Sequence, residues 1–347
     1  MKRISFLLKL LPNVVFLQKK PSSVLTRPST EKRALIEKVP VGSWDSHMHV
    51  VSIMLNGTDT ISLAALLICN INYSQIDPVN YPLAKGALYT PQPHLLPDAL
   101  RFEQSTAIRN IVLVQPSIYG TDNSCLLDAL RILGPRRARA VVAFDPETID
   151  RLTLDQWHLW GVRGVRVNTQ SIGKHMCSEE LAVTLQRYAN IIRPYNWVLQ
   201  LYVPLETAVV LEKIVPGLGV TVCLDHFGSP DLISCCRPAH NNDPYRLPGF
   251  RSLVNLLSQG NTYVKLSAPY RISRGEGRDD LEPVARELLR VAGMNRAVFA
   301  SDWPHTRFEG LDIKPYMEEL LEWCGNDEAL IQRVFRGNAE RLWGIEH

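Results

Sequence analysis

The feature that most constrains the fold of this chain is a repeat of short apolar runs that alternate with stretches of helical periodicity. Eight runs have the length and composition of strands: Gly42–His49, Asn110–Gln115, Arg139–Phe144, Val162–Asn168, Trp197–Val203, Val220–His226, Thr262–Ser267 and Ala297–Ser301. Helical periodicity separates them, as in Leu126–Leu133, Ser178–Ile192, Leu205–Val215, Phe250–Ser258, Leu281–Val291 and Pro315–Trp323. Strands that alternate with helices form parallel βα units, and eight such units close into a (β/α)8 TIM barrel. An open doubly wound sheet is the alternative, but no GxGxxG sequence follows the first run.

Polar residues capable of chemistry stand at or just after the end of each apolar run. In chain order they are Asp45, His47 and His49; Gln115 and Ser117; Asp145; Arg166 and Asn168; Gln200 and Tyr202; Asp225 and His226; Lys265 and Ser267; Ser301 and Asp302. The C-terminal ends of barrel strands form one face, and that face carries the active site in barrel enzymes. We therefore expect these side chains to surround a single mouth.

Composition narrows the class of protein further. Of the 347 residues, 46% are hydrophobic and 21% are charged, which suits a large folded core. No apolar run reaches the roughly 18 residues that span a bilayer, and a net charge of +3 is too small to predict a nucleic-acid surface. The 7 cysteines include no CxxC pair, which favours a reducing compartment over a disulfide or zinc framework. We expect a small-molecule substrate as the partner, with no nucleic acid and no membrane, and the sequence does not define the oligomeric state.

The N-terminal segment differs in composition from the rest of the chain. It contains Lys2, Arg3, Lys9, Lys19, Lys20 and Arg27, with no acidic residue before Glu31. Such a segment is typical of a mitochondrial presequence, and a disordered tail is the simpler interpretation. We predict a basic extension, residues 1–40, and a barrel domain, residues 41–347. The predicted location is the cytoplasm, or the mitochondrion if the extension is a presequence.

Asp45, His47 and His49 are spaced by two residues, so on a strand their side chains share one face, which in a barrel is the lumen. Two imidazoles that project together can hold a divalent metal or polarise a carbonyl oxygen. A hydrogen-bonded pair of structural histidines is the alternative interpretation. The functional interpretation is favoured because His226 ends the sixth run and Asp302 follows the eighth.

Three motifs in combination resemble the amidohydrolase superfamily: Trp44-Asp-Ser-His-Met-His, Leu224-Asp-His-Phe-Gly and Ala300-Ser-Asp-Trp-Pro-His. Further stretches are similar to the amidohydrolase-related branch that contains 2-pyrone-4,6-dicarboxylate lactonase and similar lactone hydrolases. They begin at Val114 (Gln-Pro-Ser-Ile-Tyr-Gly follows), Gly161 (Val-Arg-Gly-Val-Arg-Val-Asn), Lys265 (Leu-Ser-Ala-Pro-Tyr-Arg) and Gly337 (Asn-Ala-Glu-Arg-Leu-Trp-Gly). The resemblance covers about Val41 to Gly344.

The resemblance implies a role for each matching residue. Asp302 matches the aspartate that takes a proton from the attacking water. His47, His49 and His226 match histidines that, with Asp302, ligate a metal or polarise the scissile carbonyl without one. Arg166 and Arg271 match arginines that hold substrate carboxylates, and Ser117, Tyr202 and Tyr89 match hydroxyl side chains of that pocket. For Arg166 a structural salt bridge, for Ser117 a loop cap and for Tyr89 a packing role are the alternatives. The implied cofactor is none or one divalent metal, zinc being the first choice.

Two departures from the family pattern limit these implications. The lactonase pattern has another arginine six positions after the match to Arg166, where this chain has Ile172, with Lys174 close by. A lactone with fewer charges than a dicarboxylate therefore stays open as the substrate. The fourth run ends in Arg166-Val-Asn168 rather than in the lysine that members with two metals carboxylate, so we expect one metal at most.

A third departure is an insertion after the first run. The resemblance stops after Val51 and resumes near Asp77, so residues 52–76 have no counterpart in the family pattern. Such a segment would overhang the mouth as a lid, or it is an intron translated in the gene model. We favour the intron, because long insertions without secondary structure are uncommon in compact domains.

These observations predict a hydrolase that cleaves the ester bond of a small, carboxylated lactone by base-assisted attack of water. A zinc-dependent non-oxidative decarboxylase of the same superfamily is the alternative enzyme. A binding protein without activity is the third hypothesis. The joint presence of His47, His49, His226 and Asp302 argues against it, because nothing structural requires all four.

Overall fold

Eight parallel strands build the barrel that the sequence predicts, in a computed structural model that describes residues 35–51, 79–171, 173, 176–232, 243–275 and 277–345. The strands are β1 (Trp44–Met48), β2 (Asn110–Val114), β3 (Ala138–Val142), β4 (Val162–Asn168), β5 (Val198–Tyr202), β6 (Val222–Leu224), β7 (Thr262–Leu266) and β8 (Ala297–Phe299). Each overlaps one of the expected runs, and the order in the sheet is the order in the chain. The predicted (β/α)8 fold is confirmed.

The first and last strands meet at the C-terminal end of the barrel. The backbone N–H of Asp302 donates to the carbonyl oxygen of His47 at 3.0 Å, and the N–H of His49 donates to that of Trp303 at 2.8 Å. Met48 and Trp303 pair as a parallel bridge. These bonds fix His47, His49 and Asp302 relative to one another, because all three belong to the same short stretch of pairing.

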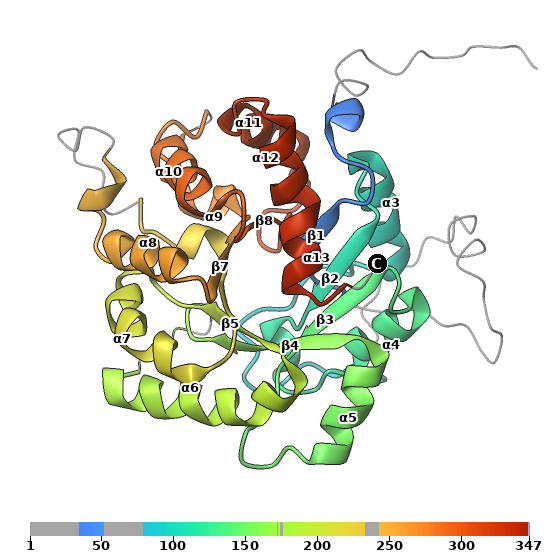
Figure 1. Ribbon diagram of the computed structural model, residues 1–347. Helices are drawn as coiled ribbons and strands as arrows, with labels where there is room; N and C mark the ends of the chain where they lie inside the picture. Colours follow the sequence, from blue (N-terminus) through green and yellow to red (C-terminus); the bar gives the residue numbers. More distant parts are fainter. Residues whose placement is uncertain are drawn as a thin grey trace, which may run out of the picture.

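The helices surround the strands (Figure 1). They are α3 (Leu96–Thr106), α4 (Ser124–Leu133), α5 (Arg151–Trp160), α6 (Ser178–Ile192), α7 (Ala208–Leu218), α8 (Phe250–Gln259), α9 (Pro269–Ile272), α10 (Glu282–Ala292), α11 (Lys314–Trp323), α12 (Glu328–Gln332) and α13 (Asn338–Leu342). Every helix expected from periodicity is present. Helix α7 begins three residues later than expected, because Leu205–Thr207 form a 3-10 turn, and it continues past Pro216 to Leu218.

Local chemistry explains the path of the chain into β4, which carries Arg166. Asp150 caps α5 by accepting from the backbone N–H of Thr153 at 2.9 Å, as N-cap carboxylates do. The helix ends at Gly161, whose φ of 111° is strained for other residues. In β4 itself, a Cβ at Gly164 would lie 2.8 Å from the carbonyl oxygen of Val198, so the close approach of β4 and β5 requires glycine.

The N-terminal end of the barrel is filled by the C-terminal segment of the chain. Trp343, which follows α13, is fully buried against Trp44 of β1 and other lumen residues. Its indole N–H donates to Ser46 Oγ at 3.2 Å, and Arg139 Nε of β3 donates to its carbonyl oxygen at 3.2 Å. This end is therefore a packed core, which leaves the C-terminal end for chemistry.

Several predictions concern residues that the structure does not describe. Most of the basic extension, all of the insertion at 52–76, and Ile172 and Lys174 lie outside the described residues. The division into extension and barrel domain, the lid or intron alternatives and the location in the cell stay predictions. Cys125, Cys177, Cys223 and Cys324, the cysteines that are described, are free thiols. Within the described part of the chain, no helix has both the length and the apolar character that crossing a bilayer demands.

Candidate active site

The end of β1 brings two buried imidazoles together. The Nε2 atoms of His47 and His49 are 3.2 Å apart, and their rings meet edge-on. His49 Nδ1 lies 2.7 Å from the carbonyl oxygen of Val114 in β2. A carbonyl oxygen only accepts, so His49 Nδ1 carries the donated proton and its Nε2 presents a lone pair in the neutral state.

Asp302, just after β8, faces the histidines. Its Oδ1 lies 3.6 Å from the Nε2 atoms of both His47 and His49 and 4.0 Å from that of His226. The other carboxylate oxygen, Oδ2, accepts from Tyr270 Oη at 2.6 Å and from Arg271 Nε at 2.8 Å. One oxygen is thus held by α9, and the other points at the imidazoles.

His226 completes the cluster from the end of β6. Its Nδ1 lies 2.8 Å from Ser267 Oγ, which follows β7, and its ring lies edge-on to Tyr202, with the centroids 4.7 Å apart. The backbone of His226 has a φ of 51° and that of Asp302 a φ of 63°. Left-handed backbone at non-glycine residues costs free energy and is concentrated at functional sites. The left-handed residues after β6 and β8 therefore indicate that this end of the barrel carries a functional site.

Beneath the cluster lies a fully buried ionic network. Lys265 of β7 donates from Nζ to Gln200 Oε1 at 2.7 Å and lies 3.4 Å from Asp225 Oδ1 and 3.3 Å from His47 Nδ1. Asp225 Oδ2 accepts from Gln200 Nε2 at 3.0 Å and from Arg166 Nη2 at 3.4 Å. Burial raises the pKa of Asp225, but the positive groups around it, Lys265 first and Arg166 with it, outweigh burial, so that the pKa lies well below its usual value. An ionised Asp225 and a lysine ammonium together hold His47 from below.

Burial makes the three site histidines poor bases. Desolvation lowers the pKa of His49 to about 4, with a further contribution from Arg166, and it lowers the pKa of His226 to about 4 as well. Burial, reinforced by Lys265, also holds the pKa of His47 well below its usual value. All three are therefore neutral at pH 7.

Asp302 behaves in the opposite way. Burial alone would raise the pKa of its carboxyl group, but the Arg271 guanidinium outweighs burial and holds the pKa well below its usual value. The site at pH 7 is thus one carboxylate that faces three neutral imidazoles.

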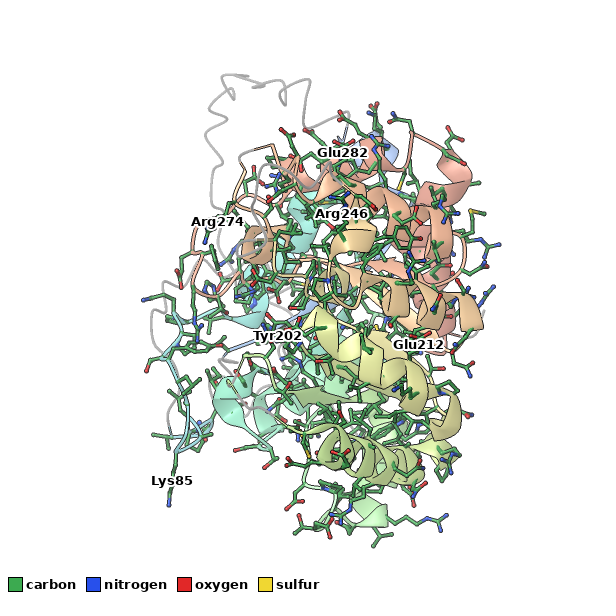
Figure 2. The ribbon with its side chains drawn as sticks, turned by 90° about the vertical axis from the view of Figure 1, so that its left-hand side faces the viewer. Lys85, Tyr202, Glu212, Arg246, Arg274 and Glu282 are labelled. Atoms are coloured by element: carbon green, nitrogen blue, oxygen red, sulfur yellow. The ribbon has the colours of Figure 1, made fainter. Side chains whose placement is uncertain are left out.

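A cavity of about 200 Å³ lies over this cluster. All of the predicted site residues except His47 line it, namely His49, Tyr89, Ser117, Arg166, Tyr202, His226, Arg271 and Asp302. Tyr202 stands at the end of β5 inside the outline of the molecule, whereas Lys85, which precedes Tyr89, lies at its edge (Figure 2). The prediction that strand ends would meet at one mouth is therefore confirmed for most of them.

Asp145 is the predicted mouth residue that points to solvent. It is exposed, and its carboxylate accepts from the backbone N–H of Glu147 at 3.0 Å, so it caps the turn after β3 instead of reaching this cavity. A short polar side chain at a loop start often binds its own backbone in this way.

The two predicted substrate arginines already have partners. Arg166 donates from Nη1 to the carbonyl oxygen of Gln115 at 3.1 Å and pairs with Asp225. It therefore forms the structural salt bridge that was the alternative prediction, and it also lines the cavity. Arg271 pairs with Asp302 and donates from Nη2 to the carbonyl oxygen of Thr306 at 3.1 Å. Their roles toward a substrate carboxylate stay predictions.

The structure also adds residues that sequence reasoning assigned no role. Tyr270 holds Asp302, and Ser267 contacts His226. Gln170 and Arg307 line the cavity, and the Arg307 guanidinium stacks on the Tyr89 ring at 4.5 Å from its centroid. The stretch that resembles the family, from Lys265 to Arg271, contained the first two, but their partners depend on three-dimensional structure.

The donor set fits a single divalent metal ion. Ligand atoms of His47, His49 and Asp302 lie within 4.8 Å of one another, and those of His47, Asp225 and His226 form a second such group. The Nε2 lone pair of His49, with Nδ1 bonded to a backbone carbonyl, is the arrangement typical of a metal-ligating histidine. Two imidazoles and a carboxylate match the ligand types of catalytic zinc.

Fold and site together define a class of protein, a (β/α)8-barrel hydrolase with a carboxylate and three histidines at the C-terminal mouth. The family model described as amidohydrolase matches residues 44–345. The chain belongs to this amidohydrolase family, as its motifs predicted.

Individual relatives are similar over most of their length. A 4-sulfomuconolactone hydrolase from Rhizobium radiobacter is 27% identical over 88% of this chain and 91% of its own. A 2-pyrone-4,6-dicarboxylate hydrolase from Comamonas testosteroni is 28% identical over 89% of this chain and 92% of its own. A solved structure from Pseudomonas putida, assigned as a 2-pyrone-4,6-dicarboxylic acid hydrolase, is 27% identical, covers 89% of this chain and 100% of its own, and superposes with a TM-score of 0.64.

Proposed function

We propose that the protein hydrolyses the ester bond of a small, carboxylated lactone. The observation that carries this proposal is the carboxylate of Asp302, ionised and held at one oxygen by Tyr270 and Arg271, with its other oxygen facing three neutral imidazoles. The relatives whose names give their substrates act on carboxylated or sulfonated lactones, and this supports the same class of substrate here.

The substrate binds through its acidic group. Arg166 and Arg271 line the cavity, and planar guanidinium groups bind carboxylates with directional, charge-assisted hydrogen bonds. Binding there places the ring over the imidazoles, with the scissile carbonyl toward the Nε2 atom of His226. Ser117, Tyr202 and Tyr89 contribute hydroxyl groups to the same wall.

Hydrolysis then proceeds by addition of water and opening of the ring. Asp302 Oδ1 accepts a proton from a water molecule as the oxygen of that water bonds to the carbonyl carbon. With its Nδ1 accepting from Ser267 Oγ, His226 donates from Nε2–H to the carbonyl oxygen as negative charge develops on it. The tetrahedral intermediate collapses with cleavage of the ring C–O bond, and Asp302 returns its proton to the leaving oxygen. The product is an open-chain acid, and the enzyme is unchanged.

We propose that the reaction uses either no metal ion or a single one, with zinc as the first candidate. His47, His49 and Asp302 are the residues that would hold it, and a bound zinc ion supplies Lewis-acid polarisation of the carbonyl. Metal analysis of the purified protein, compared with a His47→Ala and His49→Ala double variant, tests this part. A stoichiometric metal that the double variant lacks supports a resident ion.

The reaction itself is tested with a panel of lactones and aromatic carboxylic acids. Ring opening of at least one carboxylated lactone supports the proposal. Release of CO2 from an aromatic acid, without hydrolysis of any lactone, supports the decarboxylase alternative instead.

A further inference from the structure

A second cavity, of about 280 Å³, lies beside the catalytic one at the C-terminal ends of β2, β3 and β4. Its walls include Phe144 after β3, Val167 in β4, and Thr184 and Tyr188 on α6. We refer to it as the side cavity. Nothing in the proposed reaction uses it.

The walls of the side cavity suit a neutral, apolar group. Phe144 and Val167 are buried, and the Phe144 ring lies 5.4 Å from that of Tyr188. The Tyr188 hydroxyl donates to the carbonyl oxygen of Phe144 at 2.8 Å, so its single hydrogen-bond donor is in use. Among the described residues that line the cavity, none is acidic and Arg166 alone is charged.

The side cavity adjoins the catalytic cavity and shares part of its wall. Pro116, Ser117 and Arg166 line both of them. Arg166 Nε is buried and has no hydrogen-bond partner within the described part of the chain. When Arg166 binds the acidic group of a substrate, the substrate atoms next to that group therefore lie at the boundary between the two cavities.

We propose that the side cavity is a substrate subsite for an alkyl or aryl substituent on the lactone ring, next to the acidic group that Arg166 binds. This inference rests on the proposed lactone hydrolysis. Transfer of an apolar group from water to such walls is favourable in proportion to the area buried, whereas a charged group beyond the reach of Arg166 would lose its hydration without a partner. The enzyme should therefore prefer a lactone that carries an alkyl or aryl substituent at this position over an unsubstituted lactone.

Binding measurements test the subsite without turnover. The probes are 2-pyrone carboxylates that bear a hydrogen, a propyl or a phenyl group beside the carboxyl-bearing carbon, titrated calorimetrically into the Asp302→Asn protein. We expect the substituted probes to bind about tenfold tighter or more, the scale on which hydrophobic pockets discriminate. Adding Thr184→Phe, which fills the cavity from α6, should bring the ratio close to one.

Matched variants make the result specific. Val183→Phe enlarges an exposed neighbour on the same helix and should keep the preference. Ala143→Leu fills the cavity from the residue that follows β3 and replaces Thr184→Phe if that variant does not fold. Equal binding of all probes to the parent protein, or a preference that survives both filling variants, would overturn the subsite.

The kinetics separate this inference from the proposed function. If the active enzyme hydrolyses substituted and unsubstituted lactones with equal kcat/KM, the subsite is wrong and lactone hydrolysis stands. If no lactone is hydrolysed but the substituted probes still bind preferentially, the subsite stands and the proposed reaction is wrong.

Discussion

Replacement of Asp302 by asparagine is the most informative perturbation of the site. The amide is nearly the same size, and its oxygen can still accept from Tyr270 and Arg271, which hold Oδ2 at 2.6 and 2.8 Å. It cannot take a proton from water. Loss of a positioned base lowers the rate by about 10²- to 10⁴-fold, which corresponds to about 2.7–5.4 kcal/mol in the activation free energy. We expect this loss in kcat/KM.

The Asp302→Asn substitution should lower the free energy of unfolding by much less than it raises the activation free energy. Arg271 loses an ionised partner, but its side chain is 23% exposed and water can solvate it. Weakening such a charged hydrogen bond costs about 1–3 kcal/mol at most. Thermal unfolding should therefore show a folded variant with a modestly lower Tm.

The assay is the initial rate of ring opening for the best lactone of the panel, followed by absorbance. Tyr270→Phe is the matched control within the site, because it removes one hydrogen bond from Asp302 and keeps the base, and it should cost far less activity. Asp327→Asn makes the same chemical change at the N-cap of α12, where asparagine caps as well as aspartate. A folded Asp302→Asn variant that kept more than a tenth of the wild-type kcat/KM would refute the assignment of the base.

Three further outcomes are expected. Arg166→Met and Arg271→Met should raise KM for a carboxylated lactone far more than for its methyl ester, since about 1.5–3 kcal/mol of charge-assisted bonding is lost; equal effects on acid and ester would make these arginines structural. The kcat/KM profile should stay flat from neutral pH down to about pH 5 and fall only near pH 4. Burial lowers the pKa of His49 and His226 to about 4, and Arg271 keeps Asp302 ionised. A fall in kcat/KM near pH 6.5, the pKa of an ordinary histidine, would contradict this prediction. Lys265→Met should lower the free energy of unfolding by about 3–5 kcal/mol, as for a broken buried ion pair, and chemical denaturation that showed no loss would mean that Asp225 is compensated by Arg166 alone.

The barrel could be predicted because each strand has an apolar run of its own. The convergence of the four candidate residues could be predicted for a related reason: His47, His49, His226 and Asp302 stand at strand ends, and strand ends of a barrel converge. The spacing of His47 and His49 placed both on one face, and the structure brings their Nε2 atoms to 3.2 Å.

The ionic network beneath the four candidate residues could not be assembled from sequence. It depends on register, since the pairing of Leu224 with Val264 sets Asp225 beside Lys265, and the pairing of Arg166 with Gln200 sets both beside Asp225. No local pattern reports which residues of neighbouring strands are opposed. The same holds for Tyr270, whose contact with Asp302 follows from the turn that α9 makes after β7.

Two helical details also escaped the periodicity. Helix α3 was not expected because its apolar face is short, with Leu96, Ala99 and Leu100 buried among polar neighbours. Helix α7 was expected to end before Pro216, but it continues for one more turn before Gly219. Pro216 has no N–H to donate to the preceding turn, and the helix ends two residues later, at Leu218.

The central claim is that Asp302 and the three histidines hydrolyse a lactone. The most direct test is to incubate the purified protein with 2-pyrone-4,6-dicarboxylate, with 4-sulfomuconolactone and with their substituted analogues in H₂¹⁸O, and to analyse the products by mass spectrometry. We predict an open-chain acid that carries one ¹⁸O atom in its new carboxylate, formed by the wild type about 10²- to 10⁴-fold faster than by Asp302→Asn. Recovery of every lactone unchanged, or a product that has lost CO2 and gained no ¹⁸O, would contradict the account.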